Sequence, residues 1–257
     1  MKDENGVMVQ SVVRALDILC LFQQAEELGI SEIAREMGLG KSTAYGLVNS
    51  LVSRGFLEQS VTSKKYRLGI RNFELGRCTQ QRMNLRGEAA PLIKELLLPY
   101  HETVHLAAHF QGEGVFLETF PLLGAAALST QAGQRFPMHC SGMGKAMLAY
   151  LPEEYLRRHI FNRPLKALTP YTITDPGALA EDLALARRCG YAVDNQESEL
   201  GLRCIGAPIL DFRGQVSAAV SVCGPVYRMD EQRMQQIASS LVQCARLISR
   251  RMGYKAG

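Results

Sequence analysis

The sequence predicts an α+β protein with an N-terminal winged helix-turn-helix, a linker helix and a C-terminal domain that contains a sheet. Three observations predict this fold class. Two short helical patterns separated by Gly38 lie near the start of the chain, basic residues follow them, and short apolar runs alternate with helical patterns beyond residue 100. A chain of 257 residues suits two modest domains. We expect a first domain over residues 1–70, the linker helix over 71–88 and a second domain over 89–257.

Composition excludes several classes of protein. Hydrophobic residues make up 47% of the chain and charged residues 21%, which is typical of a globular protein with a core. No run approaches the roughly 18 apolar residues that a membrane span needs, and the polar start of the chain is unlike a secretory signal. Seven cysteines without a C-x-x-C pair favour free thiols in a reducing compartment. We therefore expect a cytoplasmic protein with no membrane partner.

The first helical pattern covers residues 9–24. Its apolar residues recur every three or four positions, which predicts an amphipathic helix, and a polar stretch that contains Gly29 ends it. These apolar residues are Val9, Val12, Val13, Leu16, Leu19 and Cys20.

Two shorter helices follow as a helix-turn-helix. Ser31 is the predicted N-cap of the first, which ends at Gly38, and Ser42 is the predicted N-cap of the second, which ends near Gly55. Close crossing of two helices requires small residues at the contact and in the turn. The residues that meet this requirement are Ala34, Gly38 and Ala44.

A hairpin with a basic tip comes next, as expected for a wing. Residues 56–59 and 64–68 read as its two strands, with a polar turn between them. The overall net charge is only +4, but residues 41–86 contain nine basic and two acidic residues. Such a cluster is typical of a protein that binds the phosphate backbone, although a solvated helix face could produce it.

The second helix of such a motif enters the DNA major groove by its N-terminal end. Thr43 and Tyr45 are therefore candidates for contact with base edges, whereas basic side chains would bind phosphates. A protein-interaction module of the same shape is the alternative. The candidate DNA-binding residues are Lys41, Ser42, Thr43, Tyr45, Lys64, Lys65 and Arg67.

The second domain is predicted from short apolar runs and helical patterns. Residues 70–86 form a helical linker, Gly87 and Pro91 mark a break, and a helix covers 92–98. Strands are expected over 103–110, 115–120, 125–130, 191–194, 204–210 and 216–223. Helices are expected over 142–151, 153–160 and 176–189, and a long terminal helix follows Asp230 and ends before Gly253.

Alternation in the last strand predicts a ligand cavity. One face of residues 216–223 is apolar, and the other carries small or polar residues such as Ser221 and Cys223. A polar face usually meets solvent, but Cys204 and Gly206 share a face of the preceding strand, and small residues on neighbouring strands leave room for a ligand. Free N–H groups of Gly142 and Met143 at a helix start would favour an anion, which suggests a small organic acid.

Four segments in order match one pattern: Ile30–Ala34 with Lys41–Tyr45, Lys65–Gly69, Gly133–Ala146, and Gly190–Glu197 with Gly201–Ile209. They resemble the IclR family of bacterial transcription regulators, and the likeness covers nearly the whole chain. The resemblance implies a GAF-like C-terminal effector-binding domain, a dimer or a dimer of dimers, and effector contacts at polar positions of the sheet. These positions are Asp194, Cys204, Ser221 and Cys223, added to Gly142 and Met143. Many members have Arg where this chain has Gly46.

Several motifs resemble catalytic sites. His101–His105 matches H-E-x-x-H, but it straddles a helix end and a β-prone run, where the two histidines cannot share a zinc ion. The Gly142–Lys145 segment lacks the flanking residues of a phosphate-binding loop. Cys140 precedes a helix start and could be a nucleophile or redox sensor, although a pocket-wall role is favoured. The acidic loop with Asp194, Glu197, Glu199 and Cys204 is assigned no metal.

We therefore expect a ligand-responsive DNA-binding transcriptional regulator, with a repressor favoured over an activator. Its expected partners are a double-stranded DNA operator, a small organic acid effector and further copies of the chain as a homodimer or homotetramer. No enzyme activity, cofactor or metal is expected. The alternatives are a zinc or thiol hydrolase fused to a winged helix and a protein-binding adaptor.

Overall fold

We analysed a computed structural model of the protein. The structure describes residues 8–82, 85–121 and 130–255, and over 77–82 it describes the backbone alone. The chain divides into two compact units, Met1–Met83 and Asn84–Gly257. Within the described residues, no helix is both long and apolar enough to cross a membrane.

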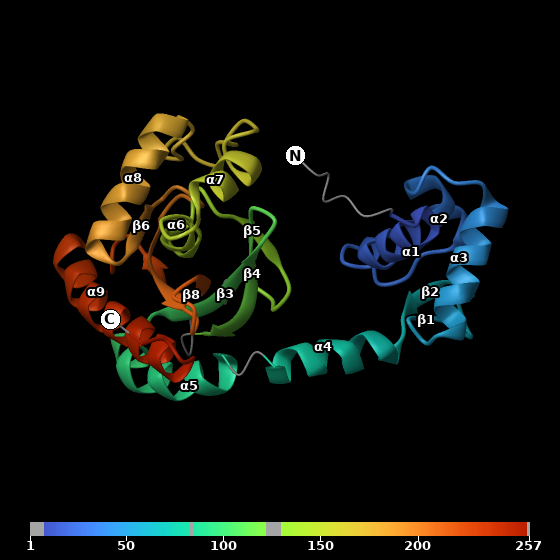
Figure 1. The fold of residues 1–257 in the computed structure, drawn as a ribbon, viewed down its shortest axis with the longest axis horizontal. Coiled ribbons are helices and arrows are strands. Elements are labelled where there is room, and N and C mark those ends of the chain that lie inside the picture. Colours follow the sequence, from blue (N-terminus) through green and yellow to red (C-terminus); the bar gives the residue numbers. More distant parts are fainter. Residues whose placement is uncertain (1–7, 83–84, 122–129, 256–257) are drawn as a thin grey trace. The chain divides into compact units, whose positions relative to one another are not determined.

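The first unit is a three-helix bundle followed by a two-stranded wing and a further helix (Figure 1). The winged helix-turn-helix prediction is confirmed. Gly38 in the turn has φ of +60°, a conformation that glycine adopts without steric strain. Leu28 forms an isolated bridge with Tyr66, which adds a third segment to the wing sheet. The elements are α1 Gln10–Leu21, α2 Ile30–Glu36, α3 Lys41–Ser53, β1 Leu57–Gln59, β2 Tyr66–Leu68 and α4 Ile70–Arg82.

The two predicted N-caps in this unit were each wrong by two residues. The N-cap of α2 is Gly29, whose N–H donates a 2.6 Å hydrogen bond to the Glu32 carboxylate, and Ser31 lies inside the first turn. The N-cap of α3 is Gly40, in an extended conformation, so Ser42 is also inside its helix. The Glu32 carboxylate at the third helical position accepts the N–H of the N-cap residue Gly29, which is a different backbone donor from those that a serine N-cap side chain binds.

The apolar stripe of α1 does not face the core of its own unit. Ile18 is fully buried, but Val9, Val12 and Leu16 are 58%, 55% and 56% exposed. The helix itself is confirmed, and most of its predicted apolar face is open to solvent. The core instead consists of Ile18, Phe22, Ile33, Val48, Leu51, Leu57 and Tyr66.

The second unit is built on one antiparallel sheet with strand order β5-β4-β3-β8-β7-β6. The central pair β7 and β8 is the longest, and β6 lies at one edge. The mixed helix and sheet prediction is confirmed. The strands are β3 Thr103–Phe110, β4 Glu113–Phe120, β5 Arg135–Pro137, β6 Ala192–Asn195, β7 Leu202–Leu210 and β8 Val216–Pro225.

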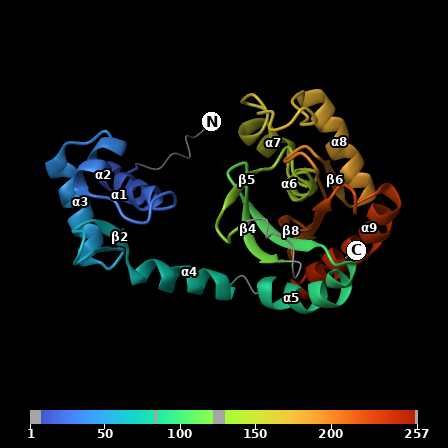
Figure 2. The ribbon, with the colours of Figure 1, turned by 180° about the vertical axis from the view of Figure 1, so that it is seen from behind.

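Helices cover both faces of this sheet (Figures 1 and 2). Leu106, Ile205 and Val220 lie in the core with α5 and α9, whereas Ala107 and Ala219 lie in the core with α6, α7 and α8. Alternate residues of one strand therefore enter different cores. The helical elements are α5 Leu85–Leu96, η1 Leu98–Tyr100, α6 Gly142–Leu148, α7 Glu153–His159, α8 Pro176–Cys189 and α9 Glu231–Arg251.

The predicted break at Gly87 and Pro91 was wrong, because both residues lie inside α5. Proline removes one helical hydrogen bond, at a cost of about 3 kcal/mol in a helix interior. Burial of Ala89, Leu92 and Ile93 against α9 offsets that cost. The helix also runs across the predicted start of the second domain at residue 89, and the three domain ranges stay a prediction.

The remaining elements agree with the sequence in part. The terminal helix α9 starts after Asp230, whose carboxylate accepts the Arg233 N–H, and the apolar residues predicted for it lie in the core or pack against it. Strand β5 was not predicted, and α6 ends three residues earlier than expected. The strand predicted over 125–130 falls mostly on residues outside those that the structure describes.

Candidate DNA-binding and effector sites

The first turn of α3 presents four of the candidate DNA-binding residues to solvent. Lys41, Ser42 and Thr43 are exposed and Tyr45 is 56% exposed, whereas Ala44 between them is fully buried. The buried alanine fixes the helix against the core, so the polar residues point away from it. A Cβ added at Gly46 would meet no atom within 4 Å, because this part of the helix surface is open.

The wing holds its basic residues next to carboxylates. Lys65 forms a 3.1 Å ion pair with Glu32 of α2, and Arg67 forms a 2.6 Å ion pair with Glu58 across the hairpin. Lys64 is at the tip with φ of +58°. The Gly29 N–H and Lys65 lower the pKa of Glu32, so this carboxylate stays charged.

These ion pairs divide the predicted phosphate contacts into two groups. Lys41 and Lys64 have no ion-pair partner within the part of the chain that the structure describes. Lys65 and Arg67 already pair with carboxylates. To bind DNA, each must either contact a phosphate while it keeps its carboxylate partner or exchange that partner for the phosphate. Exposed ion pairs contribute only about 0–1 kcal/mol, so such an exchange is energetically accessible.

In the second unit, a buried polar row crosses the sheet on the face that meets α6. Residues directly opposite in antiparallel strands share a face, and the register aligns one residue from each of four strands. A second row beside it contains Ser221 and His105. Four of the six predicted effector residues therefore lie together. The first row is Thr103, Cys223, Cys204 and Asp194.

Hydrogen bonds link these rows to β4. His105 Nδ1 lies 3.1 Å from the Thr119 hydroxyl, which lies 3.2 Å from the Thr130 hydroxyl. The Ser221 hydroxyl lies 3.7 Å from the Cys223 sulfur. The sequence analysis missed His105 and the two threonines as members of this site. For His105, a polar residue inside the otherwise apolar β3 segment was the signal that could have found it.

Asp194 ends the first row as a buried carboxyl group. Burial raises its pKa to about 7, although the Ser198 hydroxyl and the Glu197 N–H both donate to the carboxylate and oppose the shift. Charge on this side chain therefore depends on pH close to neutrality.

The start of α6 lies directly on β7 beside the polar rows. A Cβ added at Gly206 would lie 2.5 Å from the carbonyl carbon and oxygen of Gly142 and 2.6 Å from the Met143 nitrogen. The small residue at 206 therefore admits the helix, whereas the sequence suggested that it left room for a ligand. The N–H groups of Gly142 and Met143 donate no hydrogen bond within the described residues.

Lys145 is a buried cation that the sequence analysis did not single out. Its ammonium group lies 2.6 Å from Glu197 and 2.8 Å from Asp182, and the side chain is 1% exposed. Burial opposes the charged form, but the two carboxylates raise the pKa of Lys145 above its ordinary value. Burial also raises the pKa of Glu197, and Lys145 opposes that rise. The ion pairs connect α6, α8 and the loop after β6.

The structure argues against the zinc-hydrolase, reactive-thiol and metal-binding roles that three motifs suggested. Thr103–His105 lies on β3 and His101 follows η1, so the two histidines are not one helical turn apart. Burial, with the nearby carboxylates, raises the pKa of Cys140 to about 12, which opposes a reactive thiolate. Among the described residues, no group of three His, Cys, Asp or Glu is placed to hold a metal ion.

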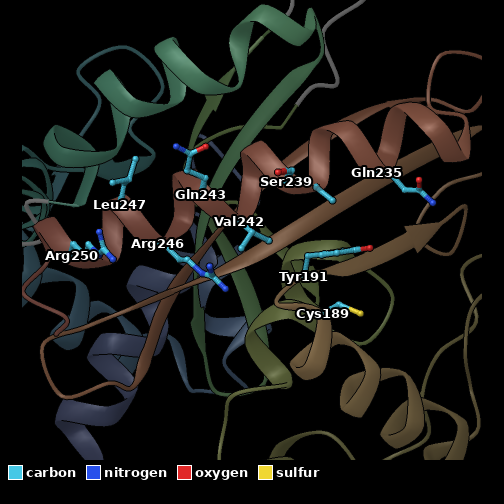
Figure 3. Close-up of a pocket in the computed structure, with 10 residues that line it drawn as sticks. Cys189, Tyr191, Gln235, Ser239, Val242, Gln243, Arg246, Leu247 and Arg250 are labelled. Carbon is cyan, nitrogen blue, oxygen red and sulfur yellow. The ribbon is translucent and has the colours of Figure 1, made fainter. Parts of the chain in front are cut away.

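A separate groove of about 570 Å³ lies between α9 and the junction of α8 with β6 (Figure 3). Arg246 and Arg250 line it, and they also line an adjoining hollow of about 370 Å³. Among the residues that the structure describes, no acidic side chain and none of the predicted effector residues lines either hollow. The groove residues are Cys189, Tyr191, Gln235, Ala238, Ser239, Val242, Gln243, Arg246, Leu247 and Arg250.

Comparisons with known proteins agree with both units. Residues 11–60 match the IclR helix-turn-helix domain, and residues 78–250 match the bacterial transcriptional regulator IclR C-terminal domain. The regulator XynR of Escherichia coli is 35% identical over 97% of this chain and 99% of its own length. The transcriptional repressor IclR of the same organism is 31% identical over 94% of this chain and 89% of its own length.

A solved structure gives a third comparison. An IclR homologue from Microbacterium hydrocarbonoxydans in complex with 4-hydroxybenzoate is 30% identical, with a TM-score of 0.82, and the match covers 94% of this chain and 98% of that one.

A winged helix-turn-helix carried on the same chain as a helix-covered sheet domain defines a DNA-binding transcriptional regulator, and the matched families and relatives are regulators of this class. The chain belongs to the IclR family of bacterial transcriptional regulators. It is not an enzyme, and the hydrolase alternatives considered for its histidine and cysteine motifs are excluded.

Proposed function

We propose that this regulator is a repressor that acts in the cytoplasm and releases its operator when the second unit binds a small organic acid. The observation that carries the effector proposal is the buried polar row of Asp194, Cys204 and Cys223, with Ser221 beside it. These side chains bond to one another and to Ser198 and the Glu197 N–H, and a ligand with a carboxylate or hydroxyl group would exchange for some of these partners. A relative that is a repressor and a homologue with bound 4-hydroxybenzoate support this choice.

The acid carboxylate is proposed to lie at the start of α6. The N–H groups of Gly142 and Met143 are free to donate there, and the hydroxyl of Ser221 and the thiols of the first row would contact the rest of the ligand. Closure of the sheet on the ligand would then shift α6, because α6 already touches β7 at Gly206.

DNA recognition is proposed to use the first turn of α3 for bases and the wing for phosphates. Thr43 and Tyr45 are exposed beside the buried Ala44, with Ser42 in the same turn. Lys41, Lys64, Lys65 and Arg67 would neutralise the backbone. Two half-sites require a homodimer or homotetramer, and the exposed apolar stripe of α1 supports self-association.

Replacing Lys41 by alanine is expected to weaken binding of the full-length protein to all duplex sequences alike. Loss of one phosphate contact should also lower the slope of log affinity against log salt by about 1.

Thr43→Ala should instead reduce the preference for the operator over unrelated DNA, because a base contact discriminates by about 1–3 kcal/mol. Fluorescence anisotropy at several salt concentrations measures both quantities.

Lys94→Ala is the control for charge, because Lys94 is exposed on α5 of the other unit. It should leave both the affinity and the salt slope unchanged. Unchanged operator preference in the Thr43 variant would refute the proposed base contact. Absence of any binding to genomic duplex fragments at low salt would refute the assigned DNA-binding residues together.

The effector proposal predicts that calorimetry detects binding of at least one acid from a panel of sugar acids, keto acids and aromatic acids that includes 4-hydroxybenzoate. Ser221→Ala should lower the affinity of the protein for that acid by about 3–10-fold, which corresponds to the loss of one hydrogen bond. Ser217→Ala is the matched control, since Ser217 lies on the same strand and its hydroxyl donates to the Ile209 carbonyl. Equal affinity of both variants and the unmodified protein would contradict the assignment of Ser221.

A further inference from the structure

Cys204 and Cys223 are cross-strand neighbours whose backbone separation is compatible with a disulfide. They are paired in the register of β7 and β8. The Val226 N–H donates to the Gly201 carbonyl at 2.9 Å, which makes 201 and 226 a hydrogen-bonded pair. Hydrogen-bonded and non-hydrogen-bonded pairs alternate, so 204 and 223 form a non-hydrogen-bonded pair with Cα atoms about 4.5 Å apart. A disulfide tolerates Cα separations of about 4.4–6.8 Å.

The two thiols already interact and differ in acidity. Burial raises the pKa of Cys223, but hydrogen bonds from Cys204 and His105 more than reverse this and lower it to about 5. The same hydrogen bond to Cys223, together with burial, raises the pKa of Cys204. Cys223 is therefore the more acidic thiol of the pair and Cys204 the less acidic one.

Other cysteines with described side chains lack this combination. Burial raises the pKa of both Cys140 and Cys244 to about 12. Neither Cys140 nor Cys244 lies opposite another cysteine on a paired strand, and Cys189 is exposed at the end of α8. The geometry and the local hydrogen bonds thus single out one pair.

We propose that Cys204 and Cys223 are a redox-active thiol pair that a hydroperoxide converts to a disulfide. The Cys223 thiolate attacks the terminal peroxide oxygen, the O–O bond breaks, and Cys223 becomes a sulfenic acid as hydroxide or an alkoxide leaves and takes a proton from solvent to form water or an alcohol. The Cys204 sulfur then attacks the Cys223 sulfur, the S–O bond breaks, and the departing hydroxide takes the Cys204 proton as water. The two sulfurs lose two electrons, and the peroxide gains them.

The regulatory consequence rests on the proposed effector site, because both sulfurs belong to its polar row. A disulfide removes the thiol donor of Cys204 and the thiolate acceptor of Cys223, so the oxidised protein should bind the acid effector less tightly. The oxidant and the acid effector would then act on the same buried polar row of the second unit.

The test treats reduced full-length protein with hydrogen peroxide, blocks remaining thiols with iodoacetamide and maps disulfides by mass spectrometry. The expected product is a Cys204–Cys223 linked peptide with loss of about 2 Da. In Cys204→Ser the sulfenic acid at Cys223 has no partner thiol with which to form a disulfide, so dimedone should label Cys223. In Cys223→Ser, dimedone should label Cys204 far less. Cys189→Ser should form the linked peptide as the unmodified protein does.

Recovery of both thiols fully alkylated after peroxide, or equal labelling of the two serine variants, would overturn the proposal. These readouts need no effector. If the linked peptide forms while no acid binds the reduced protein, the effector function is wrong and the thiol pair stands.

Discussion

Lys145→Met destabilises the second unit by about 3–5 kcal/mol, which corresponds to a decrease in Tm of roughly 6–20 °C. The expected loss is large because Glu197 is buried and its carboxylate lies 2.6 Å from the Lys145 ammonium. Methionine fills a similar volume but leaves this carboxylate without a cation. Urea unfolding of the full-length protein, followed by a signal from the second unit, measures the change in the free energy of unfolding.

The double variant Lys145→Met with Glu197→Gln tests the cause. It should recover part of the stability, because a neutral amide is less costly to bury than an unpaired carboxylate. Lys166→Met is the matched control, since Lys166 is exposed and forms no ion pair in the described residues, and it should be nearly neutral. Equal stability of the single and double variants would show that the ion pair is not the source of the loss.

Gly206→Ala is expected to destabilise the same unit by about 1–3 kcal/mol or more, because its Cβ would overlap backbone atoms. The atoms in question belong to Gly142 and Met143 at the start of α6, at 2.5–2.6 Å, and a backbone cannot give way as a flexible side chain does. The helix must move away from β7. Thermal unfolding measures the loss, and calorimetry with any acid that binds the unmodified protein measures the effect on effector affinity.

Alanine substitutions at two other glycines serve as comparisons, because the added Cβ atom has more space at each of them. A Cβ at Gly142 would meet atoms of Cys204 and Gly206 at 3.1–3.3 Å, so Gly142→Ala should have a smaller effect. Gly46→Ala places a Cβ in open space on a helix and should be neutral or slightly stabilising. If Gly206→Ala were as stable as Gly46→Ala, the close contact between α6 and β7 would not hold in solution.

The first unit was predictable because its signals are local. Helical spacing, the turn glycine Gly38 and the hairpin pattern each depend on a few neighbouring residues, and the structure places the corresponding elements within a few residues of their expected bounds. The α2 cap was wrong because the Glu32 side chain reaches back to the Gly29 backbone, a contact that residue spacing does not reveal. The apolar stripe of α1 was visible in the sequence, but its exposure was not.

The candidate effector site was predictable only in part. Alternation along β8 separated Val220 and Val222 from Ser221 and Cys223, and the structure places the two sets on opposite faces. The neighbours of those residues depend on strand order. His105 joins them because β3 pairs with β8, although more than 100 residues separate the two strands in the chain. No local pattern carries that information.

The sequence by itself determined the family through matching segments, and the two kinds of unit and the faces of the last strand β8 through residue type and periodicity along the chain. Tertiary structure alone decided that Gly206 admits α6, that Lys145 is buried between Asp182 and Glu197, and that Cys204 lies opposite Cys223. Each of these depends on the register and packing of segments distant in sequence, and a shift of one residue in a strand would turn every one of its side chains to the other face.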